Sequence, residues 1–283
     1  MPKIAVLQMT SGIDPLANAA TLCAAIAEAA GNGAVMLFAP EMSGLVDRDR
    51  KRAAPHIGSE DDSVFVATVR DAAAKAGIWV HLGSLPVTGP DGADDAAPPR
   101  ARNRSLVIAA DGSIAARYDK IHLFDIDLPS GESWRESNAY GPGEQAVVVD
   151  TPVGRLGLTI CYDLRFPKLF AALADAWAEV IAVPAAFTVP TGQAHWHVLL
   201  RARALDQGCY VVAAAQSGHH EDGRDTYGHS LVVDPWGEML MDAGAASEGG
   251  AELTYAEIDG ARIDEVRSRL PIRQHARPFT PPT

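Results

Sequence analysis

Short apolar runs alternate with amphipathic segments along the whole chain. Asp14 followed by Pro15 is a typical helix start, so we expect a helix from there to about residue 30, and a second one from about residue 62 to 76. Two further helices are predicted, from about Pro167 and over residues 195–207. The apolar runs predicted to be strands lie at residues 3–9, 34–40, 78–84, 103–110, 114–120, 146–150, 155–160, 179–186, 209–216, 229–234 and 251–259.

Strands interleaved with helices are typical of an α/β architecture. Turn signals at residues 110–113, 152–154 and 234–238 separate neighbouring strands without a helix, which predicts hairpins and therefore mixed sheets. We expect a single domain over residues 1–283. The polar segment at residues 88–102 then becomes a long surface loop within that domain.

Composition narrows the classes of partner. A hydrophobic content of 47% over 283 residues supports one large core. The net charge of -12 disfavours a protein that binds nucleic acid through phosphate contacts. No stretch approaches the roughly 20 apolar residues of a membrane span, and three cysteines make no disulfide framework. We therefore expect a cytoplasmic protein whose partner is a small molecule, with no nucleic acid and no membrane.

Four polar residues stand at or beyond the ends of predicted strands, where α/β proteins commonly carry their chemistry. They are Glu41, Lys120, Glu136 and Cys161. Taken singly, each of the three charged residues is most simply interpreted as an ordinary surface charge, and the cysteine as a small buried residue. Together they could perform nucleophilic chemistry, because Glu41 could take the thiol proton and Lys120 could hold an oxyanion. We expect the helix beginning near Pro167 to lower the pKa of the thiol, and the scheme needs no metal and no cofactor.

Three stretches carry a resemblance to a known family. "FAPEMSG", "ARYDKIHLFD" and "GLTICYDLRFP" resemble the three signatures of the nitrilase superfamily of carbon-nitrogen hydrolases. The resemblance implies a four-layer αββα sandwich with two mixed sheets, and a homodimer or higher homo-oligomer. It makes Glu41 the general base, Lys120 the oxyanion-binding and proton-handling residue and Cys161 the nucleophile. Glu136 matches a second glutamate that orients Lys120, and the backbone N–H of Tyr162 completes the oxyanion site.

Members of that superfamily hydrolyse nitriles, amides or carbamoyl groups. The motifs here resemble the Nit branch, and the stretches at residues 191–218 and 227–238 are more similar to deaminated glutathione amidases than to ω-amidases acting on 2-oxoglutaramate. The resemblance thus implies hydrolysis of a linear amide through a cysteine thioester. ω-Amidase, another amidase of the family, or an N-carbamoyl hydrolase stays an alternative, since His197 replaces a glutamate common in eukaryotic relatives.

Besides Tyr162, three residues are candidates for substrate binding. Arg165 suits a carboxylate of an anionic substrate, although an ion pair with Asp163 is an equally good interpretation. Phe187 and Thr188 follow a predicted strand and could be pocket walls or ordinary loop packing.

Two functions from other classes stay open. A metal-dependent amidohydrolase could use the histidines, which include His195, His197 and His229, although the i, i+2 pair does not share a helix face and HExxH is absent. A non-catalytic binding protein is the other. Cys23 and Cys209 have no CxxC partner and are read as core residues.

Overall fold

The computed structural model describes residues 1–89, 100–127, 131, 133–245 and 250–282. Most of the predicted surface loop at residues 88–102 lies outside the described residues, so that assignment stays a prediction. In the described part of the chain, two six-stranded sheets and four long helices build the architecture.

The first sheet combines parallel and antiparallel pairing. β1, β2 and β3 are parallel neighbours, whereas β16, β4 and β5 join in antiparallel register. Its order across the sheet is β16 (Glu252–Glu257), β1 (Lys3–Gln8), β2 (Met36–Phe38), β3 (Trp79–Val87), β4 (Arg102–Ile108) and β5 (Ile114–Asp119).

The second sheet repeats this design. β9, β10 and β11 are parallel, and the pairs at both flanks are antiparallel. Its order is β15 (Met239–Asp242), β14 (Leu231–Val233), β11 (Tyr210–Ala213), β10 (Val180–Ala182), β9 (Gly154–Leu158) and β8 (Val148–Thr151).

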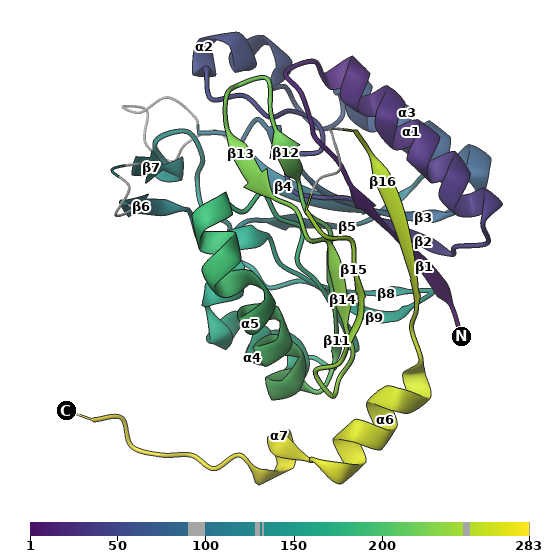
Figure 1. Cartoon of the computed structure of the whole chain (residues 1–283), viewed down its shortest axis with the longest axis vertical. Helices are drawn as coiled ribbons and strands as arrows, with labels where there is room; N and C mark the ends of the chain where they lie inside the picture. The colour runs from purple at the N-terminus through teal and green to yellow at the C-terminus, as the bar shows by residue number, and fades with distance from the viewer. Residues whose placement is uncertain (90–99, 128–130, 132, 246–249, 283) are drawn as a thin grey trace.

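Side-chain alternation along β1 shows how the layers stack. Ile4 and Val6 belong to a core shared with the second sheet, whereas Ala5 and Leu7 pack among side chains of the helices α1 (Pro15–Gly31) and α3 (Val64–Ala76). The helices α4 (Pro167–Asp175) and α5 (Val189–Gln207) cover the other face of the second sheet (Figure 1). The result is the expected four-layer αββα sandwich with two mixed sheets.

The helix α5 begins six residues earlier than predicted. Its first turn contains Pro190 and Gly192, residues that usually indicate a loop. For this reason the helix was predicted to start at His195. Proline is well tolerated in a first helical turn because its missing N–H would have no partner there. Gly192 is needed because a Cβ at this position would overlap the Tyr227 ring.

Several elements escaped prediction. All except α6, which has ten residues, have three to five residues, too few for a periodic pattern. They are α2 (Arg50–Ala53), η1 (Ala54–His56), β6 (Asp125–Asp127), β7 (Ser133–Arg135), η2 (Glu136–Asn138), η3 (Cys161–Arg165), β12 (Ser217–His219), β13 (Asp225–Tyr227), β15, α6 (Gly260–Arg269) and α7 (Ile272–His275). Across the described residues, no helix has the length and apolar character needed to cross a bilayer.

Candidate active site

A cavity of about 1010 Å³ opens beside the strand ends that carry the predicted catalytic residues. Glu41, Lys120, Glu136 and Cys161 all line it, although they are far apart in the sequence. The fold brings them together because β2, β5 and β9 end on the same side of the two facing sheets. Tyr162, Phe187 and Thr188, which were expected to bind substrate, line the same cavity.

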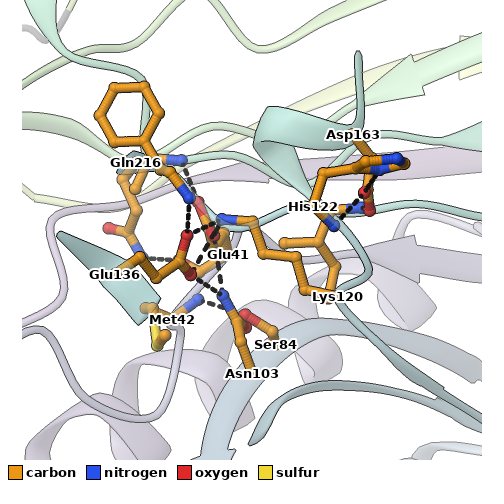
Figure 2. A network of polar contacts seen from close by, with 12 residues as sticks. Glu41, Met42, Ser84, Asn103, Lys120, His122, Glu136, Asp163 and Gln216 are labelled. Carbon is orange, nitrogen blue, oxygen red and sulfur yellow. Dashed lines mark hydrogen bonds and ion pairs between the residues drawn. The ribbon is translucent and has the colours of Figure 1, made fainter. Parts of the chain in front are cut away.

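The ammonium group of Lys120 lies between two carboxylates (Figure 2). Its Nζ is 2.9 Å from Oε1 of Glu41 and 2.9 Å from Oε2 of Glu136, and the side chain is only 2% exposed. Burial works against the charge, but the carboxylates of Glu136 and Glu41 outweigh it and hold the pKa of Lys120 well above its ordinary value. Lys120 is therefore a fixed cation at neutral pH.

Glu41 is held by both sheets. Oε1 accepts hydrogen bonds from Lys120 and from Nδ2 of Asn103 at 2.9 Å each, while Oε2 accepts one from the backbone N–H of Ala186 at 2.9 Å. Ala186 follows β10 of the second sheet, and Asn103 belongs to β4 of the first. These contacts fix the direction in which the carboxylate faces.

Glu136 has its own anchors. Its Oε2 accepts the backbone N–H of Phe124 at 2.7 Å, and its Oε1 lies 3.3 Å from Nδ2 of Asn103. Asn103 thus connects the two carboxylates that flank Lys120. Its Oδ1 is buried and has no hydrogen-bond partner among the described residues, so the hydrogen bonds of this side chain all go to the two carboxylates.

Cys161 occupies a strained turn. Its φ of 49° lies in the left-handed region, which typically costs a non-glycine residue about 1–3 kcal/mol. The residue opens the 3-10 turn η3, and its N–H donates to the carbonyl of Pro184 at 2.9 Å. The turn aims the side chain into the cavity instead of continuing the strand.

The thiol does not have the lowered pKa that we expected from the helix at Pro167. The turn η3 separates Cys161 from that helix. Burial, followed by the negative charge of Glu41, raises the pKa of the thiol well above its ordinary value, and the Lys120 cation and the Ala186 N–H offset this only in part. With the cavity empty, Cys161 is therefore a neutral thiol.

Asp163 braces the turn behind the thiol. Its Oδ2 accepts hydrogen bonds from the backbone N–H of Ile160 at 2.9 Å and from the hydroxyl of Tyr118 at 2.6 Å. Its Oδ1 accepts the backbone N–H of His122 at 3.0 Å (Figure 2). Because these partners flank Lys120 and Cys161, one fully buried carboxylate fixes the two segments relative to each other.

Arg165 lies beside the cavity. It is not among the described residues that line it, and no ion pair between Arg165 and Asp163 is found within the described residues. Its guanidinium stands 5.5 Å from the ring centre of Phe187 and 5.9 Å from that of Tyr162, and its Nη2 lies 3.3 Å from Nδ1 of His195. Its role in substrate binding stays a prediction. The arginines in the lining are Arg48, Arg50, Arg135 and Arg224.

Two of these arginines share one aromatic ring. The guanidinium carbons of Arg48 and Arg224 lie 4.5 and 5.3 Å from the ring centre of Trp134, within the range of cation–π interactions. Arg224 also pairs with the buried Asp222 at 2.7 Å. The cavity mouth therefore presents cationic groups on an aromatic platform, although the chain as a whole is acidic.

Sequence reasoning missed Asn103, Gln216 and Asp163 as supports of this cluster. Gln216 donates from Nε2 to the carbonyl oxygen of Glu41 at 2.9 Å and is fully buried. The only sequence feature that could have indicated these supporting residues is a polar residue at the start or end of an apolar run. Polar residues are common at strand ends, so this feature did not distinguish them.

Comparison with known proteins agrees with this geometry. The family model described as carbon-nitrogen hydrolase matches residues 3–268. This chain belongs to the carbon-nitrogen hydrolase family. A deaminated glutathione amidase of Yersinia enterocolitica is 38% identical over 276 residues, which cover 97% of this chain and 93% of that protein. The predicted family is thereby confirmed, and the chain is a hydrolase of carbon–nitrogen bonds other than peptide bonds.

Solved structures of carbon-nitrogen hydrolases share the fold. Saccharomyces cerevisiae Nit3, a member of branch 10 of the nitrilase superfamily, is similar with a TM-score of 0.82 and 30% identity, covering 96% of this chain and 94% of Nit3. An amidase variant from Nesterenkonia sp. AN1, with glutamine in place of a glutamate, has a TM-score of 0.76, 27% identity and coverage of 97% and 100%. That structure shows acrylamide added to the active-site cysteine. The predicted nitrilase-like sandwich is confirmed.

Proposed function

We propose that this enzyme hydrolyses the amide of deaminated glutathione through a thioester on Cys161. The observation that carries the proposal is the Lys120 ammonium, held at 2.9 Å from both Glu41 and Glu136 in the same cavity as a buried thiol. This is a preorganised arrangement of nucleophile, base and cation, and carbon–nitrogen hydrolysis through a covalent intermediate needs these three groups.

Acylation begins with a proton transfer. Glu41 takes the proton of the Cys161 thiol as sulfur attacks the amide carbon, and the carbonyl electrons move onto oxygen. Lys120 and the backbone N–H of Tyr162 stabilise that oxyanion. When the tetrahedral intermediate collapses, the C–N bond breaks and the amine leaves with the proton held by Glu41. The product on the enzyme is a thioester.

Deacylation uses the same groups in reverse. Glu41 takes a proton from a water molecule, which attacks the thioester carbon, and the oxyanion forms again beside Lys120. The C–S bond then breaks, a carboxylic acid leaves and Cys161 regains its proton from Glu41. Glu136 takes no proton in this scheme. It positions Lys120, which its carboxylate contacts at 2.9 Å.

The raised thiol pKa explains why a base is needed. A buried neutral thiol is a poor nucleophile, because the thiolate is the reactive form. A general base that acts only as the bond forms avoids a stable buried anion and contributes about 10²–10⁴-fold to the rate. Glu41 is the carboxylate that acts on this thiol, since its charge and a hydrogen bond with it both raise the thiol pKa.

The substrate assignment has two supports. The Yersinia enterocolitica and Homo sapiens relatives, 38% and 39% identical, are both named deaminated glutathione amidase. The cavity also has room for a substrate larger than 2-oxoglutaramate and carries Arg48 and Arg224 at its mouth. Deaminated glutathione has a carboxylate at each end, so one end can reach these cations while the amide lies at Cys161.

A substrate panel tests the proposal. The values of kcat/KM for deaminated glutathione, 2-oxoglutaramate, a simple nitrile and an N-carbamoyl amino acid are compared under one set of conditions. We expect deaminated glutathione to be highest. A higher value for 2-oxoglutaramate would reassign the enzyme as an ω-amidase, and a higher value for the nitrile or the carbamoyl compound would reject the amide assignment.

Other expectations belong to the same proposal. The single domain, the cytoplasmic location and the homo-oligomeric state stay predictions, which limited proteolysis, cell fractionation and sedimentation velocity would test. The metal-dependent amidohydrolase predicts that a chelator abolishes turnover, whereas the thioester scheme predicts unchanged turnover. A non-catalytic protein would hydrolyse none of the panel.

A further inference from the structure

Three side chains of the metal-ligating type meet on the surface of the second sheet. His197 lies on α5, His229 lies two residues before β14, and Asp242 is the last residue of β15. Their nitrogen and oxygen atoms all lie within 4.8 Å of one another. Within the described residues, none of the three lines the active-site cavity, so the cluster has no part in the proposed amide chemistry.

The distances suit a shared ion. Nε2 of His197 is 2.9 Å from Oδ2 of Asp242, and Nδ1 of His229 is 3.0 Å from Oδ1 and 3.2 Å from Oδ2. In a tetrahedral zinc site with bonds of about 2.0–2.1 Å, neighbouring ligand atoms lie roughly 3.3 Å apart. The imidazole-to-carboxylate distances are thus within a few tenths of an ångström of those in a ligand set, and the two imidazole nitrogens lie within 4.8 Å of each other.

The ligand atoms are held in place before any ion binds. The backbone of His229 has a φ of 55°, an unfavourable value for a non-glycine residue. Its N–H donates to the carbonyl of Gly244 at 2.7 Å, and its carbonyl accepts Nε1 of Trp196 at 2.8 Å. The imidazole stacks on Tyr227, with ring centres 4.4 Å apart.

Asp242 is oriented in a similar way. Its Oδ1 accepts the backbone N–H of Gly244 at 2.8 Å, and such an additional hydrogen bond is common for metal-ligating carboxylates. The side chains of His197, His229 and Asp242 are 29%, 22% and 28% exposed, so water can reach the remaining coordination position.

We propose that His197, His229 and Asp242 form a binding site for a divalent transition-metal ion of the zinc type. Two imidazole nitrogens and one carboxylate oxygen are the ligands that such ions prefer over Mg²⁺ or Ca²⁺. The ion fastens α5 to the hairpin of β14 and β15. Its role is structural, since the ligands come from a helix and a hairpin that are separate in the sequence.

A Zn²⁺ titration of the metal-free protein tests the proposal. Isothermal calorimetry should show one site, and saturating Zn²⁺ should raise the melting temperature, because a ligand that binds only the folded state stabilises it. His197→Ala and His229→Ala should each weaken binding on the order of 100-fold. His219→Ala is the matched control, since His219 pairs with Asp225 at 2.9 Å but no second imidazole joins them.

Cobalt substitution shows which residues bind. Co²⁺ at this site should give d–d absorption without a thiolate charge-transfer band, and amide hydrolysis should be unchanged in both histidine variants, which reports that they fold. The absence of binding, equal loss in His219→Ala, or a thiolate band from Cys23, Cys161 or Cys209 would overturn the proposal.

Discussion

At the scale of single residues, opposite charges compete for the proton of Cys161. The carboxylate of Glu41 raises the thiol pKa, and the ammonium of Lys120 lowers it. Burial adds to the effect of Glu41, so the thiol stays neutral in the free enzyme. Removing one charge at a time should therefore shift thiol ionisation and turnover in separable ways.

The first prediction concerns Glu41→Gln and Lys120→Met. Both should lose turnover by about 10²-fold or more, because one removes the base and the other the oxyanion partner. The thiol pKa should fall in Glu41→Gln and rise further in Lys120→Met. The thiol pKa is measured from the thiolate absorbance during a pH titration. Subtracting the titration curve of Cys161→Ala removes the contributions of Cys23 and Cys209. Shifts of the same sign in both variants would refute the charge assignment.

The second prediction compares Arg48→Gln with Arg165→Gln. Arg48 lines the cavity beside Trp134, whereas Arg165 lies outside the lining. Arg48→Gln should raise the KM for deaminated glutathione several-fold, because it removes an attraction common to ground and transition states. The KM for a neutral amide should stay unchanged. Arg165→Gln should change neither value. A larger rise in KM for Arg165→Gln would instead support the sequence-based prediction that Arg165 binds the substrate carboxylate.

At the scale of elements, Gly83 allows β3 to approach both catalytic segments. A Cβ there would overlap the carbonyl of Ala39, and it would come within 2.5 Å of the Pro40 carbonyl and 2.6 Å of the Pro184 Cβ. Ala39 and Pro40 lead into Glu41, and the Pro184 carbonyl accepts the N–H of Cys161. The absent side chain thus sets the separation of base and nucleophile.

The third prediction follows for Gly83→Ala. It should destabilise the fold by about 1–3 kcal/mol, as overpacking in a core does, and reduce kcat more than KM. Chemical denaturation and steady-state kinetics measure the two effects. Gly260→Ala is the control, since a Cβ at the first residue of α6 meets nothing within 4 Å. Equal behaviour of the two variants would contradict the packing argument.

The fourth prediction concerns His81 on β3. Burial lowers the pKa of its imidazole from 6.5 to about 3. Below pH 6.5 the unfolded chain therefore binds a proton that the folded protein does not, and stability falls as pH decreases towards 3. Between about pH 7.5 and about pH 5, wild type should lose roughly 2 kcal/mol more than His81→Gln, in which an amide can still contact Ser105.

Chemical denaturation at several pH values provides the measurement for His81. Comparing each protein with itself removes any constant cost of the substitution. Parallel pH profiles for wild type and His81→Gln would show that the imidazole is protonated in the folded state or accessible to solvent, contrary to its complete burial.

Element positions were largely predictable because apolar periodicity and caps are local. The helix α1 begins after Asp14 as expected, where the aspartate side chain accepts the N–H of Leu16 at 2.8 Å. The predicted start of α5 was wrong because Pro190 and Gly192 usually indicate a loop, and the need for Gly192 comes from the Tyr227 ring of a distant hairpin. Hairpin strands such as β12 and β13 are too short to leave a pattern.

At the scale of the whole molecule, the site depends on how the two sheets face each other. The backbone N–H of Ala186, from the second sheet, contacts Glu41 of the first, and Asp163 connects the segments of Lys120 and Cys161. The sequence predicted that Glu41, Lys120 and Cys161 act together, but it could not show that they lie close in space. No local pattern encodes the packing of one sheet on another.

The overall charge of the chain bears on substrate capture. A net charge of -12 repels an anionic substrate at long range, whereas Arg48 and Arg224 attract it at the cavity mouth.

The central claim is that Cys161 carries a covalent acyl intermediate, and intact-protein mass spectrometry during turnover tests it most directly. Protein quenched in acid while hydrolysing deaminated glutathione should show the mass of a 2-oxoglutaryl thioester, and peptide mapping should place it on Cys161. Cys161→Ala should be folded by circular dichroism, carry no adduct and be inactive. Turnover by Cys161→Ala, or an adduct mapped to Cys23 or Cys209, would contradict the account.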